Sequence, residues 1–287
     1  MTDLRSLGPS GLDLHLARHG RAASRELDRV CAQIHAHTTL LYWFTDLPAA
    51  LAEAKRTRRP VLSLRLLGRL DEELSCANSR FFRRLLYPEP RINRVLRDRF
   101  VLHWQSVRPV PKVTIDFGDG RTLSRTLTGN SLHVVLDAGG QPIDALPGLV
   151  DADTFRAELE RALAMAVGGR RRLATNHARA MRLPLAGGPR RRSLDASLLA
   201  PTKHVVEGPM LRGVSPAGVD VEADTRANLE LHARIHELFA RGLEWTADQL
   251  VDWIYRELFL MPPDDPALGL DVPEPFTAAP AQFAVIG

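Results

Sequence analysis

The spacing of apolar residues alternates between helical and strand periods over the first 170 residues. Residues 45–60 and 151–167 have apolar side chains at helical spacing, whereas 61–67, 132–136 and 142–146 are short runs of β-prone residues. Because the last two runs are separated only by a Gly-Gly turn, they are predicted to pair as adjacent antiparallel strands. We therefore expect an α/β protein with a central mixed sheet and with the 61–67 strand in its interior.

Turn and capping residues divide these segments. Thr45 or Asp46 is suited to cap the first of the two helices and Asp151 or Asp153 the second, and Asp119-Gly120 predicts a hairpin within residues 113–128. Ser75 is the expected N-cap of a further helix, which should bend at Pro88 and Pro90. Residues 40–44 read as a short strand or an apolar lead-in, and "FVLHW" reads as a strand after the bent helix.

The chain is expected to contain four segments. Residues 1–39 form an N-terminal helical segment, 40–168 the α/β domain, 169–202 a linker rich in Arg, Gly and Pro, and 203–287 a C-terminal helical region. This C-terminal region is predicted to hold a pair of amphipathic helices, the second of which begins with Thr246 and Gln249 at capping-box spacing. Because two helices bury little surface alone, we expect the region to dock on the α/β domain or on another subunit.

Composition and charge narrow the classes of partner. The formal charge is +4 and the pI is near 9.5, but the chain has only three lysines, Lys55, Lys112 and Lys203. The Arg-rich stretch at 168–193 has no interleaved aromatic residues on which bases could stack. A solvated basic linker is therefore favoured there, and nucleic-acid binding is a weaker hypothesis than thiol chemistry or protein binding. No apolar run of about 18 residues and no signal sequence is present, which predicts a cytoplasmic chain without a membrane partner.

The stretch "ELSCANSRFF" contains Cys76, one of only two cysteines in the chain. Two cysteines cannot make a disulfide framework, and no closely spaced pair suits zinc. A thiol at a helix N-terminus is activated by the helix dipole, but that interaction is worth about 0.3–1 kcal/mol, which is less than one pKa unit. Cys76 is therefore either a working thiol or a small apolar core residue, and Cys31 is expected in the core.

The order of elements and three local patterns resemble the thioredoxin superfamily. The patterns are "RRPVLSLRLLG", the segment from "CANSRFF" to "FVLHW", and "LDAGGQPIDALPGLVDADTFRAEL". The resemblance covers residues 40–167 and implies a thioredoxin-like three-layer α/β/α domain, to which the C-terminal helical region is added.

Within this resemblance the site has the pattern CxxS, as in monothiol members, because Ser79 stands where dithiol members have a second cysteine. The resemblance implies Cys76 and Ser79 as catalytic residues, with Ser75, Asn78 and Arg80 stabilising the thiolate. It also implies a substrate groove at Asn130 and Ser131. Ser131 occupies the place of the family's cis-proline, and a trans bond is expected there because a non-proline cis bond costs about 2.5–4 kcal/mol.

The predicted function is monothiol thiol–disulfide exchange at Cys76, with a protein or a low-molecular-weight thiol as client. Turnover would need an outside thiol or Cys31, because Ser79 cannot displace a mixed disulfide. The alternative is a redox-inert thioredoxin-fold module that binds a protein partner. We expect no cofactor and no metal: the one-turn pairs His15/His19 and His232/His236 lack the glutamate of a zinc-protease helix and are predicted to be core or solvated residues.

Overall fold

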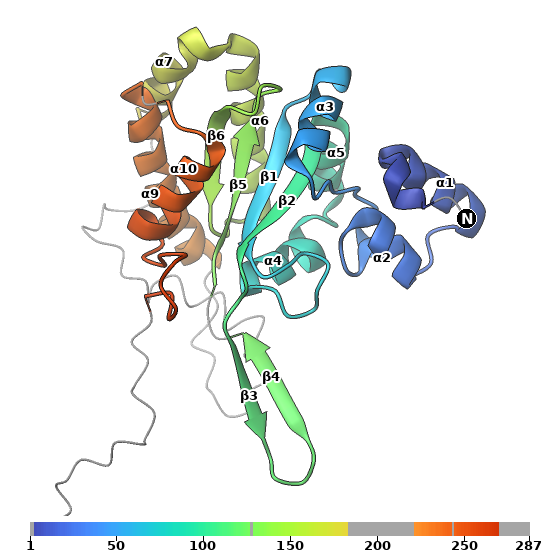
Figure 1. Cartoon of the computed structure of the whole chain (residues 1–287). Helices are drawn as coiled ribbons and strands as arrows, with labels where there is room; N and C mark the ends of the chain where they lie inside the picture. The colour runs from blue at the N-terminus through green and yellow to red at the C-terminus, as the bar shows by residue number, and fades with distance from the viewer. Residues whose placement is uncertain (1–2, 127–128, 183–220, 243, 270–287) are drawn as a thin grey trace, which may run out of the picture.

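A four-stranded mixed sheet forms the centre of the molecule (Figure 1). The computed structural model describes residues 3–126, 129–182, 221–242 and 244–269. The strands lie in the order β2-β1-β5-β6, with bounds Val101–Arg108, Val61–Leu67, Ser131–Leu136 and Pro142–Pro147. β1 pairs in parallel with β2 and antiparallel with β5, which in turn pairs antiparallel with β6. The predicted mixed sheet with an interior 61–67 strand is confirmed.

Helices cover both faces of this sheet. The helices that do so are α3 (Leu47–Thr57), α5 (Pro90–Arg99), α6 (Ala152–Gly168) and α10 (Ala247–Trp253). On one face Arg65 of β1 reaches Asp248 of α10, and on the other His133 of β5 contacts Phe155 of α6. α3 lies on the α10 face and α5 on the α6 face (Figure 1).

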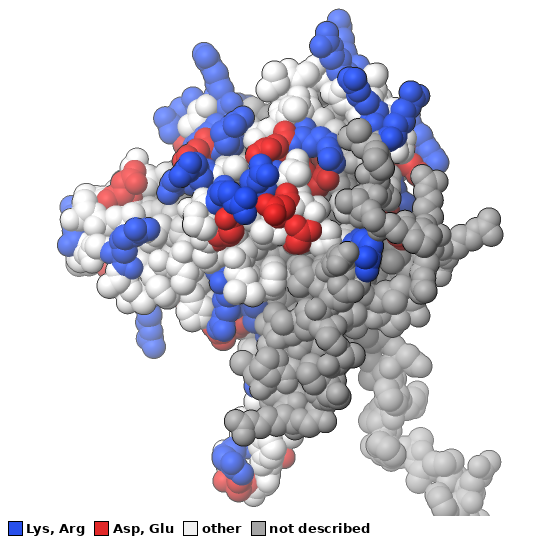
Figure 2. Space-filling model, turned by 180° about the vertical axis from the view of Figure 1, so that it is seen from behind, with Lys and Arg blue, Asp and Glu red and all other residues white. Residues whose placement is uncertain are grey.

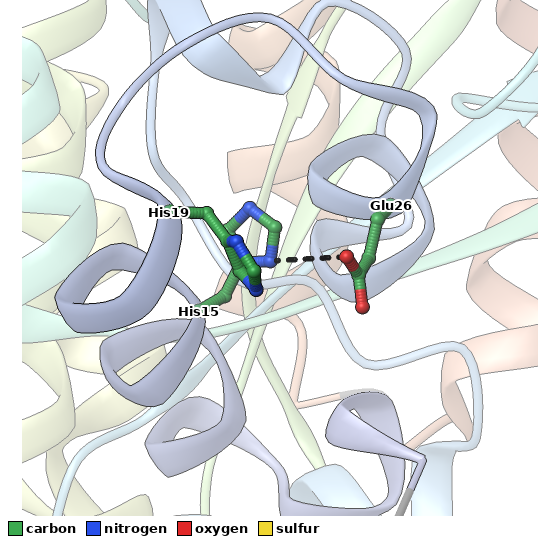
Figure 3. Close-up of side chains that lie close together, drawn as sticks. All are labelled: His15, His19 and Glu26. Atoms are coloured by element: carbon green, nitrogen blue, oxygen red, sulfur yellow. Dashed lines mark ion pairs between the residues drawn. The ribbon is translucent and has the colours of Figure 1, made fainter. Parts of the chain in front are cut away.

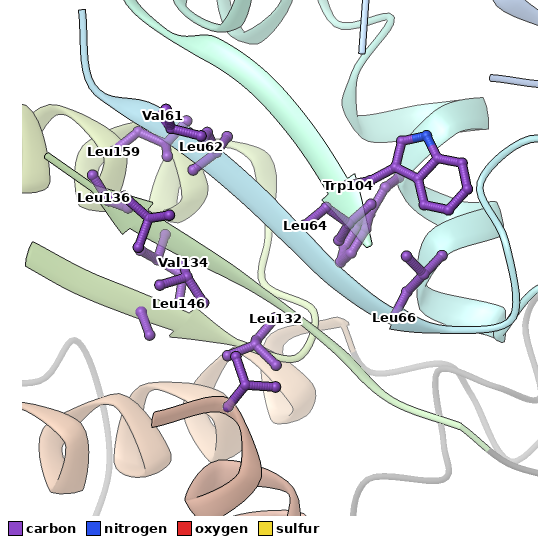
Figure 4. Packing of buried hydrophobic residues seen from close by; sticks show 14 of the residues in the cluster. Val61, Leu62, Leu64, Leu66, Trp104, Leu132, Val134, Leu136, Leu146 and Leu159 are labelled. Carbon is purple, nitrogen blue, oxygen red and sulfur yellow. The ribbon is translucent and has the colours of Figure 1, made fainter. Parts of the chain in front are cut away.

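The main core lies on both sides of β1. Every residue of this strand is buried, and its leucines pack between Trp104 of β2 and the apolar residues of β5 and α6 (Figure 4). Burying side chains on both faces explains why residues 61–67 form a continuous apolar run instead of an alternating one. The only charged residue of the strand, Arg65, is paired with Asp248.

The N-terminal segment has a small core of its own. It comprises η1 (Leu4–Leu7), α1 (Pro9–His19), α2 (Arg25–Cys31) and η2 (Ala36–Thr38). Cys31 is buried there, as expected, and burial raises the pKa of its thiol to about 12. Cys76 is also buried but belongs to the main core, so the two cysteines lie in different core clusters.

The C-terminal helices pack against the edge of the sheet, and they correct the predicted linker. α7 (Arg170–Ala180) is a helix within residues 169–202, and it packs on α9 (Val221–Ala240), which also contacts β6. Leu173 and His177 on α7 are buried, so this stretch of the predicted linker belongs to the folded body. The rest of that linker, 183–202, lies outside the described residues.

Two local predictions are settled by the structure in one of their details, and a third is confirmed. Residues 40–44 make one isolated bridge, between Phe44 and His103, so of the two predicted alternatives the apolar lead-in holds and the strand does not. The helix after β1 begins at Ala77 with Cys76, not Ser75, as its N-cap; it comprises α4 (Ala77–Phe81) and a π-helical turn, η3 (Phe82–Leu86), and α5 follows. The predicted hairpin is confirmed as a separate two-stranded sheet of β3 (Lys112–Asp116) and β4 (Thr122–Thr126).

Candidate functional site

Cys76 lies at the start of α4, directly beyond the loop that follows β1. Its amide N–H donates to the carbonyl of Leu67 at 3.1 Å, which holds it against the end of the central strand. The residue is fully buried, with an exposed fraction of 0%. The backbone of Gly129 lies against it, since a Cβ added to Gly129 would stand 2.7 Å from the Cβ of Cys76. A thiol enclosed in this way is not accessible to a large disulfide substrate.

The polar residues beside Cys76 bond to one another. The hydroxyl of Ser79 donates to Ser75 Oγ at 2.7 Å and lies 2.8 Å from the Cys76 carbonyl oxygen. Asn78 Nδ2 donates to Asn130 Oδ1 at 2.6 Å. The predicted role of Ser79 and Asn78 as donors to the sulfur therefore has no hydrogen bond to support it, because both groups have other partners.

Two buried arginines lie on α4 and η3. Arg83 donates from Nη1 to Ser75 Oγ at 2.7 Å and from Nη2 to the Glu73 carbonyl at 2.9 Å. Burial lowers the pKa of Arg83 to about 10, partly offset by attraction to Glu73. Arg80 donates to Thr126 Oγ1 at 3.0 Å, at the end of β4. These contacts connect the start of the helix to the preceding loop and to the hairpin.

The C-terminal region closes the site on its other side. Tyr255 lies on η6 (Ile254–Leu258), which continues α10, and its hydroxyl donates to the carbonyl of Asn130 at 2.8 Å. Burial, and then the proximity of Cys76, raises the pKa of Tyr255. Asn130 and Ser131, the predicted substrate groove, are themselves buried. A segment 125 residues further along the chain therefore occupies the region where an extended client was expected.

No protein-family model and no curated protein matches this sequence. The site is therefore interpreted from its own geometry.

Two groups of side chains in the described residues have the spacing of metal ligands. One lies between α1 and α2 and comprises His15, His19 and Glu26 (Figure 3). His15 is buried and its Nδ1 stands 3.9 Å from Glu26 Oε2, whereas His19 is exposed. Solvent therefore reaches this group at His19, and the ion pair between His15 and Glu26 is long.

The second group is enclosed and more tightly connected. Asp144 on β6 meets His232 and His236 on α9, one helical turn apart. His232 Nε2 lies 2.9 Å from Asp144 Oδ1, and His236 Nδ1 lies 3.9 Å from the same oxygen. His177 on α7 adds a third imidazole, with its Nδ1 2.7 Å from His236 Nδ1. Of the two predicted alternatives, core or solvated, His232 and His236 take the buried one, as members of a polar cluster.

The pKa shifts in this cluster separate charged from neutral groups. Burial alone would raise the pKa of Asp144, but the nearby rings of His232 and His236 outweigh it and hold that pKa below its usual value. Burial alone would lower the pKa of His232, yet attraction to Asp144 raises it. Burial lowers the pKa of His236 to about 3 and also lowers that of His177. The directions of these shifts favour an ion pair between Asp144 and His232 and neutral forms of His236 and His177.

Sequence reasoning missed Asp144 and His177. A signal for Asp144 was present, because a carboxylate inside the apolar strand 142–146 needs a buried partner. His177 offered no such signal, since it lies in the stretch interpreted as a linker.

Charged side chains of both signs are mixed on one face of the molecule (Figure 2). On the face in Figure 2, Lys and Arg side chains interleave with Asp and Glu and do not form one basic field. Among the described helices, none is both long and apolar enough to cross a bilayer.

Proposed function

We propose that this chain is a thioredoxin-type module that binds a protein partner and does not carry out thiol–disulfide exchange. Support for the fold comes from the strand order, from the parallel β1/β2 pair beside the antiparallel β5/β6 pair, and from the cysteine at the start of the helix after β1. Helices on both faces agree with the three-layer arrangement of that superfamily.

The burial of Cys76 is the observation that favours a binding function over thiol–disulfide exchange. Thiol–disulfide exchange needs in-line approach of an attacking thiolate to a disulfide sulfur, so the thiol must be accessible. Cys76 is 0% exposed, Tyr255 is hydrogen-bonded across the predicted groove, and the hydroxyl of Ser79 has other partners. In this arrangement Cys76 acts as a packing residue of the main core.

The β3–β4 hairpin is the surface best suited to the partner. It projects from the body (Figure 1), and its side chains alternate between an apolar and a polar face. Val113, Ile115 and Phe117 are 42%, 42% and 55% exposed, and Leu123 lies opposite Ile115. An isolated two-stranded hairpin is marginally stable in water, so an apolar groove on a partner protein would stabilise it.

A second function, monothiol exchange, is favoured by one observation. Arg83 is buried within electrostatic range of Cys76, and a nearby cation stabilises a thiolate. In that reaction Cys76 attacks one sulfur of an external disulfide and releases the other as a thiolate. An external thiol then attacks the mixed disulfide and releases the Cys76 thiolate. η6 would have to move away for either step.

Alkylation of the native chain separates the two functions. We expect iodoacetamide to modify Cys76 only after denaturation, as measured by mass spectrometry of the peptide that contains it, and we expect no turnover of a glutathione mixed disulfide with glutathione as reductant. Rapid modification of native Cys76 together with turnover would reject the binding-module proposal and favour exchange.

A further inference from the structure

Four enclosed side chains from three elements converge at the edge of the sheet. They are Asp144 on β6, His177 on α7, and His232 and His236 on α9, with exposed fractions between 0% and 5%. Asp144, His232 and His236 each offer a ligand atom within 4.8 Å of the other two, with 2.9 Å from His232 to Asp144 and 3.9 Å from His236 to Asp144. Ligands of a tetrahedral ion with metal–nitrogen bonds near 2.0–2.1 Å stand about 3.3 Å apart, so these two separations are within about 0.6 Å of that value. His177 lies beside this set, with its Nδ1 2.7 Å from His236 Nδ1.

The hydrogen bond made by His177 directs its lone pair into the cluster. Its Nε2 lies 2.9 Å from the carbonyl oxygen of Ile143, which can only accept, so this nitrogen carries the proton. In the neutral ring Nδ1 is then unprotonated, and it faces His236. A backbone carbonyl that fixes the tautomer of an imidazole is the usual support of a metal-ligating histidine.

A second support lies on α6. Glu158 Oε2 stands 3.6 Å from His232 Nδ1, on the side of the ring opposite Asp144, and Glu158 is itself bonded by Arg161. A carboxylate behind a histidine orients the ring and increases its basicity as a ligand. In addition, Asp144 Oδ2 is buried without a hydrogen-bond partner among the residues that the structure describes.

We infer that Asp144, His232 and His236 form a buried binding site for one divalent transition-metal ion of the zinc class, with His177 beside them as the imidazole that turns its lone pair toward His236. Two imidazoles and one carboxylate favour zinc over magnesium or calcium, which prefer oxygen ligands. Bound there, the ion would fasten α9 to β6.

Metal content and a cobalt spectrum test this site. The full chain is unfolded with chelator and refolded with either Zn²⁺ or Co²⁺, so that the ion does not have to enter an already closed cluster. We expect one ion per chain by mass spectrometry of the metal. We also expect intense visible bands of tetrahedral Co²⁺ without a thiolate charge-transfer band, because neither cysteine is a ligand.

Variants distinguish this site from other metal-binding groups. His236→Ala should abolish stoichiometric binding, and Glu158→Gln, which leaves the ligands in place, should weaken it about 10–100-fold. His19→Ala, in the other histidine group, is the matched control and should bind as the parent chain does. If His236→Ala does not fold, Glu158→Gln carries the comparison.

Two results would overturn the inference. One is a refolded parent chain with native circular dichroism that retains no stoichiometric metal and leaves Co²⁺ with the spectrum of its hydrated ion. The other is a loss of metal in His19→Ala while Glu158→Gln binds as tightly as the parent chain.

Discussion

His133 and His232 are both enclosed imidazoles, yet their pKa values move in opposite directions. His133 lies between Phe82 and Phe155, and its Nε2 contacts the hydroxyl of Tyr87 at 2.7 Å. Burial lowers its pKa to about 3. For His232 the same burial is outweighed by Asp144, and the pKa is raised. The charge of the partner, and not burial itself, decides which form of a buried histidine is stable.

The two regions therefore have different roles in the fold. His133 is surrounded by aromatic rings and the hydroxyl of Tyr87, with no charged group in contact with its ring in the described part of the chain, whereas the buried cation Arg83 lies beside Cys76. The cluster around Asp144 keeps an ion pair at the edge of the sheet, where the C-terminal helices dock. A buried polar cluster contributes specificity of docking when all its members are satisfied, and it is costly when one is removed.

The largest expected effect is at Asp144. Asp144→Ala removes the carboxylate that faces His232 and His236, and breaking a buried ionic pair in this way costs about 3–5 kcal/mol of unfolding free energy. Denaturant unfolding with chelator present measures the loss without any contribution from metal. Asp98→Ala, on the exposed surface of α5, is the control and should change stability by about 0.5 kcal/mol or less. Similar losses in the two variants would contradict the distinction between the regions.

Acidification should destabilise the folded chain, because the buried His133 is neutral in it. The pKa of His133 is about 3 in the folded chain and about 6.5 when unfolded. The contribution of the neutral imidazole to the free energy of unfolding is therefore complete above pH 6.5 and is lost as the pH falls toward 3. The expected loss is about 1.4 kcal/mol per pH unit in that range, or about 2 kcal/mol at pH 5. Unfolding curves of the parent chain and of His133→Gln should differ in slope against pH by that amount. Parallel curves would show that His133 is accessible to protons.

The regular elements could be predicted because each has one clear period. Residues 61–67 form β1 with the same bounds, and Asp151 caps α6 as expected. α7 was missed because its composition is dominated by arginine and resembles a solvated linker, whereas its burial depends on α9, which begins more than 40 residues later. Periodicity detects a helix that has a wide apolar face, and α7 buries only a few side chains.

The candidate sites were less predictable than the fold. Cys76 was correctly placed at a helix start, but its enclosure depends on Tyr255 and on the close backbone of Gly129. Neither contact is visible in the local sequence. The partners of Asp144, His232 and His236, likewise lie 88 or more residues away, and only the folded chain brings them together.

A smaller effect is expected where the C-terminal region closes over Cys76. Tyr255→Phe removes the hydrogen bond to the Asn130 carbonyl and should cost about 1 kcal/mol. It should also accelerate alkylation of Cys76, because the contact that holds η6 in place is weakened. Tyr42→Phe is the matched control, since it removes a hydroxyl that donates to the Arg5 carbonyl and lies against the N-terminal core cluster, to which Cys76 does not belong. An equal alkylation rate in both variants would argue that η6 does not protect Cys76.

The smallest effect on stability is expected at the β3–β4 hairpin, which contains neither a buried histidine such as His133 nor a buried ion pair such as that of Asp144. Ile115 is 42% exposed on the apolar face, so Ile115→Asp should change the unfolding free energy by about 0.5 kcal/mol or less. It should nevertheless abolish partner binding, because a carboxylate entering an apolar groove would lose its water without gaining a counter-charge. Thr114→Asp places the same charge on the polar face of the same strand, where Thr114 faces Ser124, and should leave binding unchanged. A photo-crosslinker at position 117, compared in the two variants, measures this: one discrete adduct should form with Thr114→Asp and disappear with Ile115→Asp. Adducts that are equal in both variants would place the partner elsewhere and leave the apolar face of the hairpin without a binding role.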